Sequence, residues 1–431
     1  MILNLQSERE IIMKKTIEQP TTNSTIISSD LYEVIFPLLR SALWGNDVFP
    51  FTCEESVDWN AINKELQLQA IRVLPVDVIA CHDKAHSSIL LQSTTRSMRK
   101  WYTLMQEQQK LYLLFKDANI PFVILKGAAA NIYYPKPSYR QMGDIDLIVK
   151  PEDFDKATKL MSEHNYEQLN EEDYRHQEYR KNGVSFELHR SFAILKEDEP
   201  ATWLDTQIFN GISNVQDAQI DGFHFPMLPT MENGLVLLTH INQHLESGLG
   251  LRQIIDWMLF VNKELDDAYW YSTFEDATDK IGLKTLAITV TKMCQKYLGL
   301  TQTITWAQQA DDTLCDTLME YIITQGNFGR KFDEGSNNAI KAMSVKNLAL
   351  LCSYIQHTGI TNWKAIEKYP FLKPFAWIYQ IFHYIHIIFQ RKHPFKQLRE
   401  EYTQSNIRNN MFEQLQVARH AKETINQNTK S

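Results

Sequence analysis

Helical periodicity dominates this 431-residue chain, but residues 119–229 break it with a series of strand-like segments. The segment PFVILKG is a short apolar run that ends at Gly127, and DIDLIVKPEDF contains a second strand. The arms YRHQEYRK and VSFELHR flank Asn182-Gly183, a dipeptide typical of two-residue β-hairpins. A further strand pair is predicted near Ile220–Leu228. The chain must therefore build a small sheet inside a mostly helical protein.

The flanks of this stretch predict the domain organisation. Polar residues in QPTTNSTIISS indicate disorder over residues 1–27. We expect a helical N-terminal region over 28–118, an α/β core over 119–229, a helical C-terminal domain over 230–405, and a surface helix or tail over 406–431. Apolar spacing predicts helices near 87–118, 231–246, 250–264, 268–298, 304–326, 345–357 and 371–391. The predicted fold class is α+β, with a small mixed sheet and a mostly helical remainder.

Composition narrows the location and the partners. The net charge is −8, so the chain as a whole is not built to bind polyanions. Its five cysteines lack C-x-x-C spacing, which indicates reduced thiols in a cytoplasmic protein. The segment Phe371–Phe389 is the best candidate for a membrane span, but it contains a lysine, a proline and two histidines. We therefore expect an amphipathic helix there and no stable membrane insertion.

Two acidic residues occupy one strand of the predicted core. Asp144 and Asp146 are two positions apart in GDIDLIV, so both side chains project from the same face of the strand. Two neighbouring anions are unfavourable unless a cation neutralises them. Oxygen ligands of this kind suit Mg²⁺ or Mn²⁺. The spacing therefore predicts a metal site, although surface acid pairs that are merely solvated are also common.

The predicted hairpin supplies a third acid. In VSFELH the apolar residues alternate with Ser185, Glu187 and His189. If this strand lies beside the first, Glu187 joins Asp144 and Asp146 on one face of the sheet. Three carboxylates can hold two metal ions, and Glu187 would be both a ligand and a general base.

These motifs carry a family resemblance. LKG, YP-x-P-x-x-R, GDIDL and FELH resemble the uncharacterised nucleotidyltransferase family of the DNA-polymerase-β superfamily, over about residues 119–260. The resemblance implies that Asp144 and Asp146 are paired metal ligands and that Glu187 is the third acid. It also implies that Gly127 marks a turn where backbone N–H groups approach a triphosphate. Ala128 follows this glycine, whereas most of the superfamily has Ser or Gly there.

Several other residues are candidates for supporting roles. Lys126 and Arg140 are predicted to neutralise phosphate oxygens, and each has the alternative of pairing with the acid cluster. His240 and His244 lie one helical turn apart, a spacing that zinc sites use, but we favour a structural role because no intervening Glu completes the metalloprotease motif and no cysteine lies nearby. Arg252 and Asp256 can pair along one helix, and Arg252 has the alternative of reaching the nucleotide.

The predicted chemistry is Mg²⁺-dependent transfer of a nucleoside monophosphate from an NTP to an acceptor hydroxyl. Net acidity favours a small molecule or a protein over RNA as the acceptor. Two alternatives remain open at this point. One is a non-catalytic partner or regulatory protein that kept the fold, and the other is a metal-dependent phosphohydrolase that uses the same acids.

Overall fold

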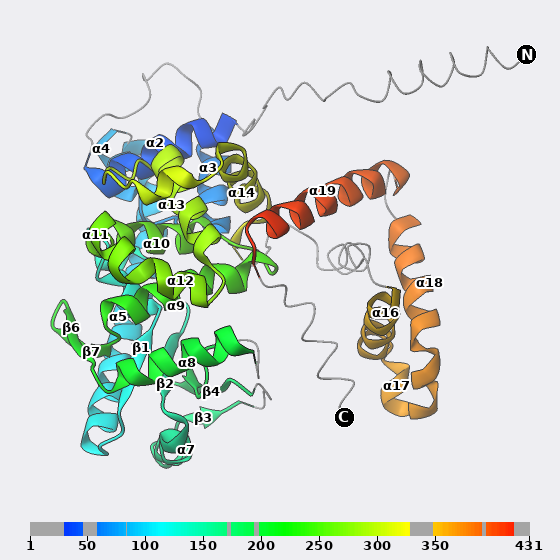
Figure 1. The fold of residues 1–431 in the computed structure, drawn as a ribbon, viewed down its shortest axis with the longest axis horizontal. Coiled ribbons are helices and arrows are strands. Elements are labelled where there is room, and N and C mark those ends of the chain that lie inside the picture. The colour runs from blue at the N-terminus through cyan, green and yellow to red at the C-terminus, as the bar shows by residue number, and fades with distance from the viewer. Residues whose placement is uncertain are drawn as a thin grey trace, which may run out of the picture.

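The computed structural model describes residues 30–45, 58–82, 84–169, 174–193, 198–327, 348–389 and 394–417. Within these ranges a mixed sheet is surrounded by helices, which confirms the predicted α+β class (Figure 1). The predicted disordered segment 1–27 lies outside the described residues, as do residues 418–431 of the predicted tail.

The sheet has seven strands in the order β3-β4-β5-β2-β1-β7-β6. Their bounds are β1 Phe122–Leu125, β2 Ile145–Val149, β3 Glu167–Gln168, β4 His176–Lys181, β5 Val184–His189, β6 Gln216–Ile220 and β7 Phe223–Met227. The pairs β2–β5 and β1–β7 are parallel, and the other neighbouring pairs are antiparallel. Each predicted strand is present, and β4 and β5 form the predicted hairpin.

The hairpin turn has the expected cause. Asn182 and Gly183 both have positive φ angles, 51° and 75°, which is the conformation of a type I′ turn. This turn fixes the register of the two arms, so that Lys181 pairs with Val184 and, further out, His176 pairs with His189.

One face of the sheet packs against α5 (Lys84–Asp117) and α7 (Phe154–Glu163). Ile145, Leu147 and Phe186 are almost completely buried in this core. The alternation expected for the acidic strand is therefore present, because its odd-numbered apolar residues all point into this layer. The polar residues between them are left for the opposite face.

The opposite face meets a second, larger core made mainly of helices. Leu125 and Ile148 point into it from the sheet, and α9 (Thr230–Leu245) and α10 (Leu251–Glu264) supply much of its apolar surface. The N-terminal helix α2 (Asp30–Trp44) joins the same core. The other helices and helical turns of this body are α3 Trp59–Leu68, α4 Val76–His82, α6 Gly127–Asn131, η1 Pro137–Tyr139, η2 Pro151–Asp153, α8 Glu199–Ile212, α11 Asp267–Tyr269, η3 Trp270–Phe274, α12 Glu275–Lys280, α13 Lys284–Leu298, η4 Trp306–Gln309 and α14 Asp312–Gln325.

Two predicted helices are broken where the sequence contains local stop signals. The prediction of one helix over 268–298 is wrong, because a π-helical turn, η3, interrupts it and Gly282, with a φ of +69°, ends α12. The predicted helix over 304–326 is also divided. Asp311 caps α14 by accepting a hydrogen bond from the backbone N–H of Leu314, so the helix starts there.

The last described helical elements are α16 Leu348–Asn362, α17 Ala365–Lys368, η6 Pro370–Phe375, α18 Ala376–Phe389 and α19 Pro394–Gln414. α16, α17 and α18 lie apart from the body in Figure 1, whereas Met411 and Phe412 at the end of α19 are buried in the larger core. The prediction of one helix over 371–391 is corrected, because α18 begins only at Ala376, after the η6 turn. α19 continues across residue 405, so a domain boundary placed there would divide one helix. Among the described residues, no helix has the length and apolar character that a bilayer crossing requires.

Candidate active site

The parallel pairing of β2 with β5 brings the predicted acids together. Asp146 is the direct neighbour of Glu187 in the register of the two strands. Asp144 lies immediately before β2, two residues from Asp146. All three line one pocket on the polar side of the sheet, as the alternation of the two strands predicted.

Two cationic groups contact these acids. The Nζ of Lys126 lies 2.8 Å from an Asp146 oxygen, and Nε2 of His189 lies 3.2 Å from both Asp146 and Glu187. Burial lowers the pKa of His189, but its hydrogen bonds to Asp146 and Glu187 raise it above the ordinary value overall. Glu187 shows the reciprocal effect: burial raises its pKa, but the hydrogen bond from His189 and the charges of Lys126 and His189 together lower it to about 2.

Asp144 experiences a different environment. Burial and the charge of Asp146 raise its pKa, although Lys126 and Arg252 act in the opposite direction. The positive groups of the chain therefore do not fully compensate the acid cluster. An uncompensated cluster of oxygen donors is the arrangement that a hard divalent cation stabilises.

The pocket has a volume of about 430 Å³, within the range of small-molecule sites. Nine of the ten residues singled out from the sequence line it: Lys126, Gly127, Arg140, Asp144, Asp146, Glu187, His240, His244 and Arg252. Asp256 is the exception and lies behind the lining, where it holds Arg140.

The turn after β1 places Lys126 at the pocket. Lys126 has a φ of 49° and Gly127 a φ of 21°, and the five-residue helix α6 begins at Gly127. A Cβ atom on Gly127 would lie 3.2 Å from the side chain of Met142, so the turn has little room for a larger residue. This chain path brings the Lys126 ammonium group to Asp146.

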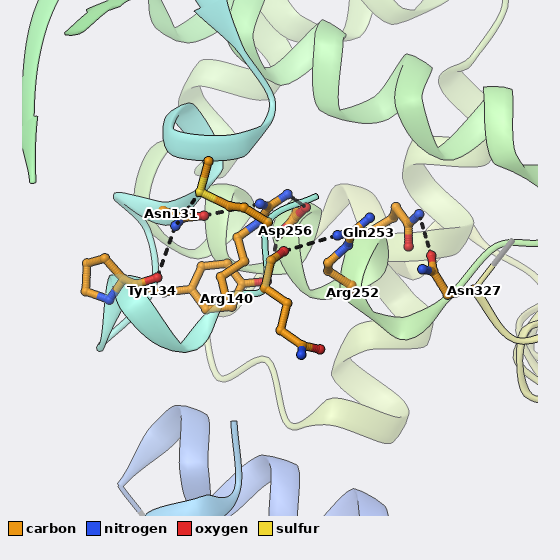
Figure 2. A network of polar contacts seen from close by, with 10 residues as sticks. Asn131, Tyr134, Arg140, Arg252, Gln253, Asp256 and Asn327 are labelled. Carbon is orange, nitrogen blue, oxygen red and sulfur yellow. Dashed lines mark hydrogen bonds and ion pairs between the residues drawn. The ribbon is translucent and has the colours of Figure 1, made fainter. Parts of the chain in front are cut away.

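Arg140 is held by a partner that the sequence did not suggest. Its Nε and Nη2 each donate to an Asp256 oxygen at 2.7 Å, and its Nη1 donates to Asn131 at 3.2 Å (Figure 2). Tyr134 donates to Asp256 at 2.6 Å. Arg140 and Asp256 are both buried, so this is a bidentate ion pair inside the protein. The contacts favour the pairing alternative for Arg140, with Asp256 in place of the acid cluster.

The sequence suggested that Arg252 pairs with Asp256 along one helix, but Asp256 holds Arg140 instead and Arg252 has other contacts. Its Nη1 donates to the backbone carbonyl of Gln141 at 3.1 Å, and its Nε is buried without a hydrogen-bond partner in the described part of the chain. Burial and the nearby charge of Arg140 lower its pKa, while Asp256 and Asp144 raise it. Arg252 lines the pocket and faces the acid cluster with spare donor capacity.

His240 and His244 form part of the pocket wall contributed by α9. Their ring centroids are 4.6 Å apart and nearly perpendicular. Burial and the neighbouring His244 lower the pKa of His240 well below its ordinary value, and burial together with Lys126 lowers that of His244 to about 3. Within the described ranges, no third His, Cys, Asp or Glu joins them at metal-ligand spacing. Both histidines are neutral groups of the wall.

Sequence analysis overlooked His176 and gave His189 no role. A metal-ligand set found in the described part of the chain comprises His176, Glu187 and His189, whose ligand atoms lie within 4.8 Å of one another. The signal was present in the sequence. Counting outward from the Asn182-Gly183 turn pairs His176 with His189, because each arm contributes one residue at every step of the ladder.

Comparison with known proteins identifies the family. The sequence profile described as "uncharacterised nucleotidyltransferase" matches residues 55–299, more than half of the chain. The chain belongs to this family. The match begins well before residue 119, so the nucleotidyltransferase family region includes most of the N-terminal helical region as well as the sheet. A search of curated proteins found no match.

One solved structure is similar to part of this family member. It is an antigenic nucleotidyltransferase-like protein from Paracoccidioides brasiliensis, 15% identical, with a TM-score of 0.31. The similarity covers 48% of this chain and 93% of that one.

Proposed function

We propose that this chain is a nucleotidyltransferase that transfers a nucleoside monophosphate from an NTP to an acceptor hydroxyl and releases pyrophosphate. One observation carries the proposal: Asp146 and Glu187 are direct neighbours on parallel strands, with Asp144 beside them, in a pocket that is also lined by the cationic side chains of Lys126 and Arg252. Acids for a metal and cations for phosphate are the two requirements of phosphoryl transfer.

Asp144, Asp146 and Glu187 are the residues that would hold Mg²⁺ or Mn²⁺. The donor set fits such an ion, because it consists of carboxylate oxygens in a place where burial and the charge of Asp146 raise the pKa of Asp144. When bound, the ion neutralises phosphate oxygens and lowers the pKa of an attacking hydroxyl.

Lys126 and Arg252 are the residues that we assign to the triphosphate. Lys126 is mostly buried beside Asp146, and Arg252 keeps a buried Nε–H without a partner among the described residues. Both lie on the same pocket as the acids. Arg140 is assigned to positioning, because its Nε, Nη1 and Nη2 all donate to protein groups.

Glu187 is assigned to ligation more than to proton transfer. A general base works best when its pKa is near the working pH, and although burial raises the pKa of Glu187, the hydrogen bond from His189 and the nearby positive charges lower it to about 2. Asp144, whose pKa is raised, is the stronger base of the two. This assignment revises the expectation that Glu187 acts as the general base.

The acceptor is proposed to be a small molecule or a protein side chain, since the net charge of −8 disfavours RNA. The test is incubation of the full chain with each α-labelled NTP, Mg²⁺ and cell extract, followed by mass analysis of the labelled species. We expect a labelled adduct that is absent with Asp146→Asn and present with Asp155→Asn, which changes an exposed acid of α7.

Two other results would overturn this proposal. Free labelled nucleotide without any adduct would indicate a phosphohydrolase. No binding of NTP with or without Mg²⁺, measured by calorimetry, would indicate a non-catalytic member of the family.

A further inference from the structure

Beside the carboxylates of the proposed active site lies a second set of ligands with different chemistry. His176 on β4 and His189 on β5 are direct cross-strand partners, and their ring centroids are 5.0 Å apart. Glu187 is two residues before His189 on the same strand, so both side chains leave the same face of the sheet. The ligand atoms of the three residues lie within 4.8 Å of one another.

We propose that His176, Glu187 and His189 form a binding site for a divalent transition metal ion, distinct in selectivity from the oxygen-only set of Asp144 and Asp146. Glu187 belongs to both sets and would connect them. The inference shares this residue with the proposed function but does not depend on nucleotide transfer.

The spacing fits a single ion. Ligand atoms bound at 2.0–2.2 Å cannot be further apart than about 4.4 Å, so atoms within 4.8 Å of one another need at most a small side-chain adjustment. The rigid base for this adjustment is the hairpin, whose turn fixes the register between the two histidines.

His189 has the surroundings of a metal ligand. Its side chain is more than nine-tenths buried, it lines the pocket, and its Nδ1 has no hydrogen-bond partner within the described ranges. Its Nε2 lies 3.2 Å from both Asp146 and Glu187. Nε2 is therefore the ring nitrogen that faces the proposed co-ligand Glu187, and Asp146 holds the ring in this orientation.

Ligand chemistry decides the kind of ion. Two imidazoles and one carboxylate favour ions such as Fe²⁺, Co²⁺ and Zn²⁺, whereas Mg²⁺ prefers oxygen ligands and keeps much of its water. Three protein ligands also leave coordination positions open, as catalytic sites do and closed structural zinc sites do not. The site would therefore retain a transition metal in the presence of excess Mg²⁺.

The experiment titrates the metal-free full chain with Co²⁺, with millimolar Mg²⁺ present, and follows the visible absorption that Co²⁺ gains from nitrogen ligands. We expect one equivalent to bind, and Zn²⁺ to displace it. His176→Ala should weaken Co²⁺ binding by at least about 10-fold and change its spectrum. The matched control is His224→Ala, which removes an exposed histidine of β7 that pairs with Asp217, and it should bind Co²⁺ as the wild type does.

A further pair of variants separates this site from the proposed function. Asp144→Asn is expected to lose nucleotide transfer and to keep Co²⁺, because Asp144 belongs only to the oxygen set. His176→Gln, which keeps a polar side chain of similar size, provides a folded variant if the alanine variant does not fold.

Co²⁺ that Mg²⁺ displaces, or Co²⁺ binding and spectrum unchanged in both His176 variants, would overturn the inference and leave the proposed function standing. If Co²⁺ binding depends on His176 but the protein fails to bind NTP, the metal site stands and the proposed function is overturned.

Discussion

Replacing Arg140 with methionine tests how the buried ion pair behind the pocket works. Arg140 and Asp256 are both almost completely buried, and two hydrogen bonds of 2.7 Å join them. Arg140→Met would leave the Asp256 carboxylate inside the protein, where the Tyr134 hydroxyl is its remaining side-chain donor among the described residues. Removal of one partner from a buried pair costs about 3–5 kcal/mol. With a urea m-value of about 3 kcal/mol/M, the unfolding midpoint should fall by roughly 1–1.7 M.

The double variant Arg140→Met with Asp256→Leu makes the prediction specific. Replacing both charges by apolar groups of similar size is often close to neutral, so most of the lost stability should return. The remaining loss is the unpaired Tyr134 hydroxyl, about 1–3 kcal/mol. Urea unfolding followed by circular dichroism gives both midpoints. If the double variant is as unstable as the sum of the two single variants, the pair is not coupled and this reasoning is wrong.

The same double variant decides between the two roles considered for Arg140. If the guanidinium only positions the loop after α6 against α10, the stable double variant should bind NTP with an affinity within a few-fold of the wild type. If Arg140 contacts phosphate, NTP binding should be lost although the fold is restored. Calorimetric titration with NTP and Mg²⁺ distinguishes the two results.

Four further predictions concern the pocket. At pH 7 Asp144→Asn should raise the melting temperature of the metal-free protein, because burial and the charge of Asp146 raise the pKa of this carboxyl. The gain should disappear below about pH 4, where this carboxyl is protonated in the unfolded chain as well as in the folded one. A lower melting temperature at pH 7 would contradict the assignment. Asp146→Asn should instead destabilise the metal-free protein by about 3 kcal/mol, since it leaves buried Lys126 unpaired, and a calorimetric scan shows the contrast. Glu187→Gln should reduce transfer by about 10²-fold or more, because it removes one of the three proposed metal ligands, with a smaller effect on the Kd for NTP because Asp144 and Asp146 remain; near-normal turnover would refute its place in the site. His240→Ala should reduce the free energy of unfolding by about 1–3 kcal/mol and so lower the melting temperature, without removing bound metal. Metal analysis of this variant checks that outcome.

Local patterns in the sequence predicted the sheet well, because strand faces depend on alternation alone. Ile145, Leu147 and Val149 of β2 point into one core, as their spacing required, and this fixed the face on which Asp144 and Asp146 lie. The Asn182-Gly183 turn similarly fixed the hairpin and the face of Glu187. These features depend on residues that are close in the sequence.

Partners that are distant in the sequence could not be predicted in the same way. Asp256 is 116 residues from Arg140, and only the packing of α10 behind the loop makes them neighbours. The nearer candidate for Asp256 was Arg252, one helical turn away, and local spacing alone favoured it. The breaks within the predicted helix 268–298 had a different cause, since Gly282 was a local stop signal that the apolar periodicity outweighed.

The order in which the strands pair also matters for how the chain folds. β4 and β5 are joined by a two-residue turn and can pair early. Asp146 and Glu187 are far apart in the sequence and meet only when β2 docks in parallel beside β5. This docking closes a long loop and brings two carboxylates together in the same event, so both chain entropy and charge repulsion oppose it. The centre of the sheet is therefore expected to form late, and an intermediate that contains only the hairpin has no acid cluster. Divalent cations added during refolding should accelerate this last docking step and leave hairpin formation unchanged.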